Sequence, residues 1–403
     1  MATTPGTWIT TTEAAQRLGV KRATLYAYVS RGLLRSERRP GQQESLFDRM
    51  QIDAMASATR PPGGPQPVLR FRSIATSVSS QAEGELFYRG RPLGDVVALG
   101  SLEAAAALVL GTAVPPWSPA LPRTADIDLS TLPLERRMPV AVQLLAAVDP
   151  FASDTDPEQV RAAALPVLRA ALTLVAGGGA TAGPARRDHA PARPDLADAA
   201  DMASLALAAL GGSPSRAGDV AVLRVLLVAL LDHGLTASTV AARVAASTRA
   251  GLHDCLSAAY AAMAGPLHGA APVAAHHLLA EGVEPGVLVA RSLRERGGVA
   301  GFGHFLYPEG DPRADVVLDA LWRRRGTTRL RRRVEGLATL VAERSGALPN
   351  IDLASAAVLH ALGLPAESGE VVFQVARSVG VAAHVVEEYA EEPLRWRGRD
   401  PQG

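Results

Sequence analysis

An almost unbroken helical pattern of apolar residues runs from Asp198 towards the end of the chain, and it constrains the fold more than any other feature. Within it, residues 219–231 are apolar nearly all round, which is typical of a helix buried in a protein core. Ala, Leu, Val and Arg dominate the composition, and Ala, Leu and Arg are good helix formers. A chain of 403 residues is long enough for two or three domains, so we predict an all-α protein with more than one domain.

The composition excludes several classes of site. Lys21 is the single lysine beside 40 arginines, so neither a phosphate-loop lysine nor a Schiff-base lysine is expected. Cys255 is the single cysteine, which excludes an intrachain disulfide and a cysteine-cluster metal site, and we predict no metal centre. The formal net charge of +1 gives the whole chain no general affinity for polyanions.

We expect a soluble cytoplasmic protein that does not cross a membrane. Arg224 and Asp232 bracket the apolar run at residues 225–231, which is much shorter than the roughly 20 residues that a spanning helix needs. No charged and then apolar leader opens the chain.

Residues 8–58 form a unit of their own with the pattern of a winged helix-turn-helix. Its expected elements are a helix capped by Thr11 or Thr12 and ending at Leu18, a helix over residues 21–29, a hairpin within residues 33–47 and a third helix near residues 48–56. Residues 1–60 carry nine basic against five acidic side chains, mostly in the second helix and the hairpin. A basic helix with a basic wing is the electrostatic pattern of a DNA-binding module.

The stretch TEAAQRLGVKRATLYAYVSRGLL resembles the winged modules of MerR and excisionase proteins, although Tyr26 stands where those modules usually have arginine. The resemblance implies that two sets of side chains contact DNA. The groove would be contacted by Lys21, Arg22 and Thr24, and the phosphates by Tyr28 and Arg31. The alternative is a small protein-contact domain whose basic surface is merely solvated.

Three loops further along the chain carry residues suited to catalysis. GFGHFLYPEGDPR, at residues 301–313, brings glycine backbone up to His304 and ends on Arg313. GPLHG places His268 just past a helix that stops at a Gly-Pro pair, and PNIDLAS carries Asp352. Histidine exchanges protons near neutral pH, and an arginine fork suits a carboxylate. Asp352 also fits the N-cap of the helix that follows it.

His, His and Asp in these three settings resemble the catalytic set of citrate synthases, and DHGLTASTVAARVAAS and ARSVGVAAHVVEE extend the resemblance over about residues 70–400. It implies a homodimer with a helical large domain and a smaller domain that closes over the substrates. The expected parts are a winged helix-turn-helix at residues 1–60, a linker at 61–69, the large domain at 70–268 and 357–403, and the small domain at 269–356.

The resemblance implies a tricarboxylic acid cycle acyltransferase that condenses acetyl-CoA, or another short acyl-CoA, with oxaloacetate. The products are citrate or 2-methylcitrate and CoA, and no cofactor is needed besides the coenzyme A thioester itself. Asp352 is the implied base that takes a proton from the acyl group. His268 holds the thioester oxygen, and His304 donates to the ketone oxygen of oxaloacetate.

Oxaloacetate carries two carboxylates, so cationic partners are expected around it. His233, in the Asp-His pair, Arg313 and Arg377 match the family's ligands. A further arginine reaches in from the partner subunit near the C-terminus, where Arg395 and Arg397 both fit and Arg395 is favoured. The remaining histidines are expected to be structural or, for His189, to lie on an exposed loop.

Several positions depart from the family pattern, including Gly234 and Thr236 after the Asp-His pair and the residues that follow GPLHG. Phe305 and Pro308 stand where the family has basic residues facing coenzyme A, and Leu353 and Ala354 replace an aromatic pair. These changes predict weaker affinity for coenzyme A and a weakened activity.

The rival hypothesis is a DNA-binding transcriptional regulator whose citrate synthase-like domain senses a dicarboxylate or an acyl-CoA. A twofold dimer pairs two DNA-reading helices, as half-site recognition requires. We rank the enzyme first, because a regulator has no need to keep two loop histidines, an aspartate and three arginines together.

Overall fold

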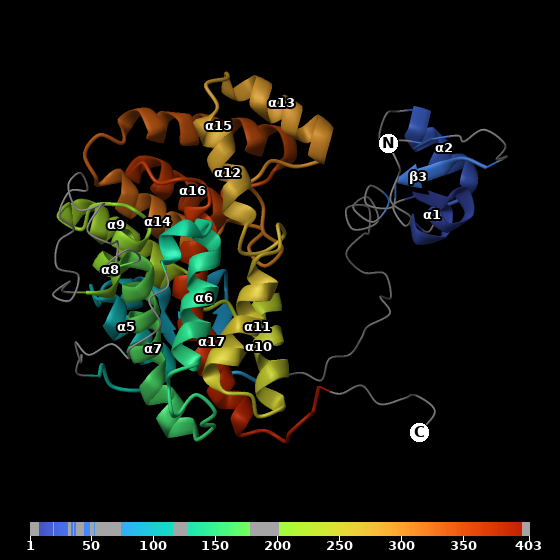
Figure 1. The fold of residues 1–403 in the computed structure, drawn as a ribbon. Coiled ribbons are helices and arrows are strands. Elements are labelled where there is room, and N and C mark those ends of the chain that lie inside the picture. Colours follow the sequence, from blue (N-terminus) through green and yellow to red (C-terminus); the bar gives the residue numbers. More distant parts are fainter. Residues whose placement is uncertain are drawn as a thin grey trace, which may run out of the picture. The chain divides into compact units, whose positions relative to one another are not determined.

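The structure is a computed structural model that describes residues 8–18, 20–30, 34, 36–37, 44–48, 52, 74–115, 128–177 and 201–396. The chain divides into two units, Met1–Ile74 and Ala75–Gly403 (Figure 1). The expected linker at residues 61–69 lies outside the described residues.

The described residues of the N-terminal unit include helices α1 and α2 and an antiparallel sheet in the order β1-β3-β2. Its elements are β1 (Trp8–Thr10), α1 (Thr11–Leu18), α2 (Arg22–Ser30), β2 (Ser36–Glu37) and β3 (Leu46–Asp48). The β2–β3 pairing confirms the predicted hairpin, and Leu25 and Phe47 are fully buried in the core of the unit. The predicted third helix near residues 48–56 lies mostly outside the described residues, among which Ile52 is helical. Asp48 itself pairs with Trp8 of β1, a strand that the sequence pattern did not reveal.

The cap of α1 also differs from the prediction. Thr10 Oγ1 accepts a hydrogen bond from Glu13 N at 3.2 Å, and the Glu13 carboxylate accepts one from Thr10 N at 2.9 Å. This reciprocal pair is a capping box, which needs an acidic residue three positions after the cap. Thr11 is instead buried and donates to the carbonyl oxygen of Ser45, so capping by Thr11 or Thr12 was wrong.

The C-terminal unit is almost entirely helical, as predicted. It begins with a small antiparallel sheet of β4 (Ser79–Ala82), β5 (Glu85–Tyr88) and β6 (Arg91–Pro92). The helices that follow are α4 (Leu93–Val97), α5 (Leu102–Leu110), the 3-10 helix η1 (Leu129–Thr131), α6 (Leu134–Ala146), α7 (Pro157–Gly177), α8 (Met202–Ala209), α9 (Ala217–Ala229), α10 (Ala237–Ser247), α11 (Leu252–Met263), α12 (Ala271–Ala280), α13 (Pro285–Arg296), α14 (Pro312–Trp322), α15 (Thr328–Ser345), α16 (Ile351–Leu362) and α17 (Ser368–Tyr389).

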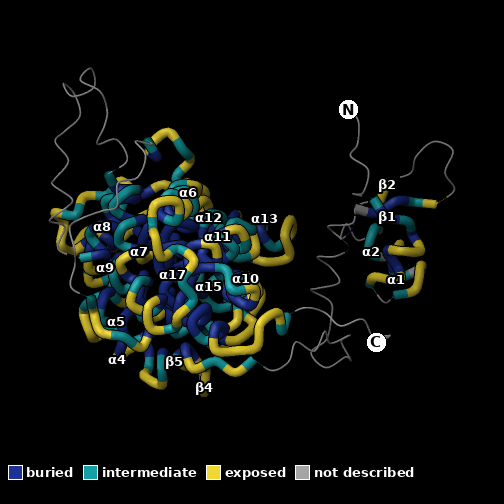
Figure 2. The backbone as a smooth tube through the Cα atoms, turned by 60° about the horizontal axis from the view of Figure 1, so that its bottom comes forward, coloured by how far each residue is buried: buried dark blue, intermediate teal, exposed yellow. Residues whose placement is uncertain are grey.

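Helix α17 is the centre of this unit and is buried along nearly its whole length (Figure 2). It packs against α5, α6, α7, α9, α10, α11 and α12. Gly380 permits a close approach to the chain after α9, because a Cβ there would lie 2.4 Å from the carbonyl oxygen of Leu231. This packing fixes the Asp232–His233 pair against α17.

Helices α12 to α15 lie together towards one end of the unit (Figure 1). There α13 packs against α15, and both α12 and α14 pack against α16. The predicted small domain, residues 269–356, covers these helices and the first turns of α16.

Among the described helices, α7 is long and apolar enough to cross a membrane. It packs against α6, α8 and α17, and buried core helices commonly have the same length and composition.

Candidate active site

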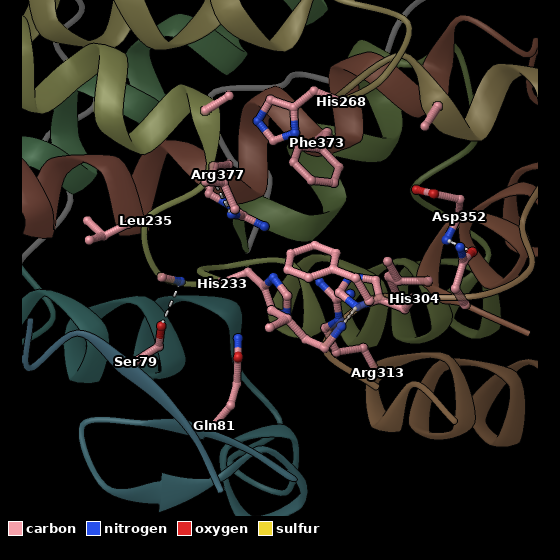
Figure 3. A pocket seen from close by; sticks show the side chains of 18 of the residues that line it. Ser79, Gln81, His233, Leu235, His268, His304, Arg313, Asp352, Phe373 and Arg377 are labelled. Carbon is pink, nitrogen blue, oxygen red and sulfur yellow. Dashed lines mark hydrogen bonds between the residues drawn. The ribbon is translucent and has the colours of Figure 1, made fainter. Parts of the chain in front are cut away.

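One pocket of about 860 Å³ brings together six of the predicted site residues (Figure 3). Its wall comes from β4, the chain between α9 and α10, the loop before α12, the loop before α14, the start of α16 and the N-terminal half of α17. The predicted residues that line it are His233, His268, His304, Arg313, Asp352 and Arg377.

The His304 loop is fastened to the chain that enters α16. Gly303 N donates to the carbonyl oxygen of Leu348 at 2.7 Å, and Asn350 N donates to that of Gly301 at 2.9 Å. Gly301 has a φ of +84°, and a Cβ there would lie 2.8 Å from the Leu353 side chain. Glycine is therefore required at Gly301 both by conformation and by space.

Asn350, rather than Asp352, caps α16. Its Oδ1 accepts hydrogen bonds from Asp352 N at 3.0 Å and Leu353 N at 3.4 Å. The expected cap role of Asp352 was therefore wrong, because the cap lies two positions earlier and leaves the Asp352 carboxyl in the pocket. Burial raises the pKa of Asp352 to about 6, against the opposing charge of Arg313. Such a carboxyl group is suited to act as a base near neutral pH.

One hydrogen bond decides which ring nitrogen of His304 carries the proton. Leu306 N donates to His304 Nδ1 at 3.2 Å, so a neutral ring carries its proton on Nε2. Burial, together with the charge of Arg313, lowers the pKa of His304 and favours this neutral form. The ring stacks on Phe305, with 5.1 Å between their centroids.

His233 lies 5.3 Å from His304, centroid to centroid, and its Nε2 is 3.0 Å from the hydroxyl of Tyr307. Burial lowers the pKa of His233 to about 2, and the charges of Arg313 and Arg377 lower it further. His233 is therefore a neutral hydrogen-bonding group rather than one of the expected cations. Sequence reasoning missed Tyr307, whose one signal was its place in the His304 loop.

His268 Nε2 lies 2.8 Å from Ser238 Oγ, and the ring makes an edge contact with Phe373 at 5.4 Å. Burial and the charge of Arg377 lower the pKa of His268 to about 4, so this ring is also neutral at pH 7. Thr236 occupies the N-cap position of α10, but its side chain makes no capping hydrogen bond. The Ser238 hydroxyl is placed to orient the His268 ring.

The two buried arginines are held differently. Asp311 binds Arg313 through two parallel hydrogen bonds, from Nε at 2.9 Å and from a terminal nitrogen at 2.8 Å. Arg377 donates Nε to the carbonyl oxygen of Leu230 at 3.1 Å and one terminal nitrogen to Thr236 Oγ1 at 3.3 Å. Its other terminal nitrogen is buried and has no hydrogen-bond partner among the described residues. A buried donor without a partner is costly, and a bound carboxylate oxygen would satisfy it.

Arg395 does not line the pocket of its own subunit. Its guanidinium donates two hydrogen bonds of 2.6 Å to the carboxylate of Glu388 and lies over the ring of Trp396. Arg397 is outside the described residues. The role of Arg395 in the site of a partner subunit stays a prediction.

The remaining described histidines, His253, His276, His277, His360 and His384, lie outside this pocket. His384 is fully buried and bonds to the Asp232 carboxylate at 3.3 Å, next to the site. Within the described ranges, no three His, Cys, Asp or Glu side chains are placed to hold a metal ion.

In the N-terminal unit, Lys21 and Arg22 are exposed, as DNA contact requires. Arg22 also donates to Thr12 Oγ1 at 2.6 Å. Thr24 is half-buried, Tyr28 packs against the core of the unit, and Arg31 lies outside the described residues.

Comparison with known proteins identifies both parts. Residues 8–60 match a helix-turn-helix domain. A citrate/2-methylcitrate synthase of Bacillus subtilis is 35% identical over 175 residues, which cover 42% of this chain and 47% of that protein. The chain therefore spans about half the length of this curated relative. A 2-methylcitrate synthase of Mycobacterium tuberculosis is 28% identical over 339 residues, which cover 77% of this chain and 82% of that protein.

The fold is also similar to that of a solved structure. The crystal structure of citrate synthase from Thermotoga maritima has a TM-score of 0.66 and 24% identity, and the match covers 83% of this chain and 94% of that one. Residues 68–398 match the family described as the C-terminal domain of citrate synthase. The chain belongs to the citrate synthase family and carries an N-terminal helix-turn-helix domain.

Proposed function

We propose that this protein is a citrate synthase-like acyltransferase. It condenses acetyl-CoA, or another short acyl-CoA, with oxaloacetate and releases citrate, or 2-methylcitrate, and CoA. One observation carries the proposal: His268, His304 and Asp352 share a pocket with Arg313 and with the unpartnered nitrogen of Arg377. We also propose that it is a cytoplasmic homodimer and that it uses no cofactor besides the coenzyme A thioester.

The first step makes an enolate from the acyl thioester. The Asp352 carboxylate takes a proton from the carbon next to the thioester carbonyl, a task for which a pKa of about 6 suits it. Negative charge then develops on the thioester oxygen. His268 donates a hydrogen bond to that oxygen, and the hydrogen bond between its ring and Ser238 holds the ring in place.

The second step forms the carbon–carbon bond. The enolate carbon attacks the ketone carbon of oxaloacetate, and the proton on His304 Nε2 passes to the ketone oxygen as it becomes a hydroxyl. The proton that Asp352 took from the acyl group balances this transfer and restores neutral His304. Water then attacks the thioester carbonyl, so that the carbon–sulfur bond breaks and a carboxylic acid and free CoA thiol are released.

Oxaloacetate would be held by its two carboxylates. Arg313 and Arg377 line the pocket as cations, and His233 adds a neutral hydrogen bond. We propose that Arg395 of the partner subunit completes the site, and that residues 269–356 form a mobile small domain that closes over the substrates.

The test is release of free thiol by the purified full-length protein. CoA should appear from acetyl-CoA or propionyl-CoA only when oxaloacetate is present, and Asp352→Asn should abolish the release. Absence of turnover with every acyl-CoA tried, in an assay that works for a citrate synthase, would overturn the proposal.

A second candidate function is DNA-dependent regulation, in which the citrate synthase-like unit senses a dicarboxylate or an acyl-CoA. The observation that favours it is the helix-turn-helix unit, whose second helix begins at the exposed Arg22, directly after the exposed Lys21. Both functions are compatible within one chain.

A further inference from the structure

The mouth of the pocket is formed by large apolar side chains that face water. Leu267 is 97% exposed and Phe305 is 88% exposed, and both line the pocket. Leu235 and Leu306 line it as well, with 37% and 40% exposure. We call these four residues the apolar rim. An exposed apolar cluster beside a binding pocket is typical of a surface that a ligand covers.

The charged side chains that line the pocket are less exposed than the apolar rim. Arg313 and Arg377 are buried and Asp352 is half-buried. Among the described residues that line the pocket, none of the exposed ones carries a charge. The rim therefore offers hydrophobic contact and no ion pair to the part of a substrate that crosses it.

The rim is continuous with the proposed reaction centre. Phe305 stacks on His304 with the rings 15° from parallel, and Leu267 directly precedes His268. A group attached to the carbon that Asp352 deprotonates begins among the catalytic side chains. A long group that leaves the pocket beside His268 or His304 would meet the exposed side chains of Leu267 and Phe305.

We infer that the apolar rim binds the alkyl chain of a medium-chain acyl thioester. This inference rests on the proposed function and specifies its acyl substrate. The reaction is the condensation described above, with an alkyl substituent on the attacking carbon, so the product is a citrate that carries an alkyl chain. Phe305 and Leu267 set the chain-length preference, because covering their exposed faces removes apolar surface from water.

The first experiment measures kcat/KM for straight-chain acyl-CoA substrates from two to twelve carbons, with oxaloacetate saturating. Partial burial of each methylene should raise kcat/KM about twofold until the chain outgrows the rim. Octanoyl-CoA should therefore exceed acetyl-CoA by at least about tenfold. A profile that peaks at acetyl-CoA or propionyl-CoA would overturn the inference and leave the proposed function intact.

The second experiment uses Phe305→Ala and Leu267→Ala, with Phe151→Ala as the matched control. Phe151 is 73% exposed but does not line the pocket. Each rim variant should lower the ratio of octanoyl-CoA to acetyl-CoA kcat/KM about threefold or more, whereas the control should keep the wild-type ratio. Unchanged ratios in both rim variants, with native circular dichroism, would contradict the role of the rim.

The third experiment separates the inference from the proposed function. Calorimetry without oxaloacetate should show octanoyl-CoA binding more tightly than acetyl-CoA, and Phe305→Ala should reduce that difference. If this holds and no acyl-CoA is turned over, the proposed function fails while the rim still binds an alkyl chain. Octanoyl-N-acetylcysteamine should keep the advantage over its acetyl analogue, and loss of that advantage would assign the rim to the coenzyme A carrier instead.

Discussion

The side-chain amide of Asn350 donates a hydrogen bond to the carbonyl oxygen of Gly303 at 2.9 Å. Asn350 caps the helix that carries Asp352, and Gly303 directly precedes His304. A single side chain therefore sets the position of the proposed base relative to that of the proposed proton donor. Because catalysis is sensitive to small displacements of such groups, this contact is a suitable place to test the site.

Asn350→Ser should separate capping from positioning. Serine can cap the helix but is too short to reach Gly303. The free energy of unfolding should therefore change by less than about 0.5 kcal/mol, while kcat should fall by about tenfold. Asn350→Ala should lose the same activity and a further 1 kcal/mol or so of stability. Denaturant unfolding and CoA release measure the two effects, and wild-type kcat in Asn350→Ser would contradict the positioning role.

The pH dependence of kcat/KM should follow the ionisation of Asp352. Its pKa is raised to about 6 by burial, so the active carboxylate form is lost as the pH falls through 6. Activity should rise about tenfold per pH unit below this pKa and level off above pH 7. The check is kcat/KM measured between pH 4.5 and 8. If activity is still high at pH 5 and falls only towards the ordinary aspartate pKa, Asp352 does not have the raised pKa that this prediction requires.

The same shift predicts that Asp352→Asn is more stable than the wild type while its activity falls at least 100-fold. The folded-state pKa lies above the ordinary aspartate value of 3.8, so ionisation opposes folding. The gain in the free energy of unfolding of Asp352→Asn over the wild type should be absent below pH 4, grow between pH 4 and 6, and reach about 1–2 kcal/mol above pH 6. Unfolding curves at pH 4 and pH 7.5 provide the check, with Asp319→Asn, an acid of α14 outside the pocket, as the control.

Two glycines of the His304 loop should differ in their tolerance of alanine. Both have positive φ, at +84° for Gly301 and +80° for Gly303. Because alanine disfavours this conformation, either substitution should lower the free energy of unfolding by about 1 kcal/mol. A Cβ at Gly301 also collides with Leu353, whereas one at Gly303 would have its nearest neighbour, the Ala347 Cβ, at 3.6 Å. Gly301→Ala should therefore cost about 3 kcal/mol in total. Equal melting temperatures for the two variants would argue against the loop packing.

Complementation between inactive subunits tests the proposed dimer. Arg395→Ala and His304→Ala should each be inactive alone. Because a mixed dimer would contain one intact site, their mixture should recover about a quarter of the wild-type activity. A fully active Arg395→Ala homodimer would show that Arg395 is not needed.

DNA binding by the N-terminal unit should depend strongly on salt, since phosphate contacts release counterions. Lys21→Ala should weaken binding to all sequences and reduce the slope of log K against log salt by about one. The rate of condensation should not change. If DNA binding survives deletion of residues 1–60, the helix-turn-helix is not the part of the protein that binds DNA.

The sequence by itself determined the helical fold, the buried helix at α9 and the loops that carry His268 and His304. These features depend on local properties: the period of apolar residues, the break imposed by Gly265 and Pro266, and the freedom of glycine backbone. The hairpin of β2 and β3 was predicted, but β1 was missed, because a short pairing such as that of Trp8 with Asp48 depends on a distant partner rather than on a repeating pattern.

Only the tertiary structure decided how the site residues act. Ser238 reads as a helix cap in sequence, yet it bonds to His268, thirty positions away. Tyr307 meets His233 because separate segments converge on α17, and no local pattern encodes that meeting. The same convergence buries Asp352 and raises its pKa, since desolvation acts on a carboxyl group through everything packed around it. Residue types and their spacing identify the candidate catalytic side chains, whereas tertiary packing determines their protonation states and their hydrogen-bond partners.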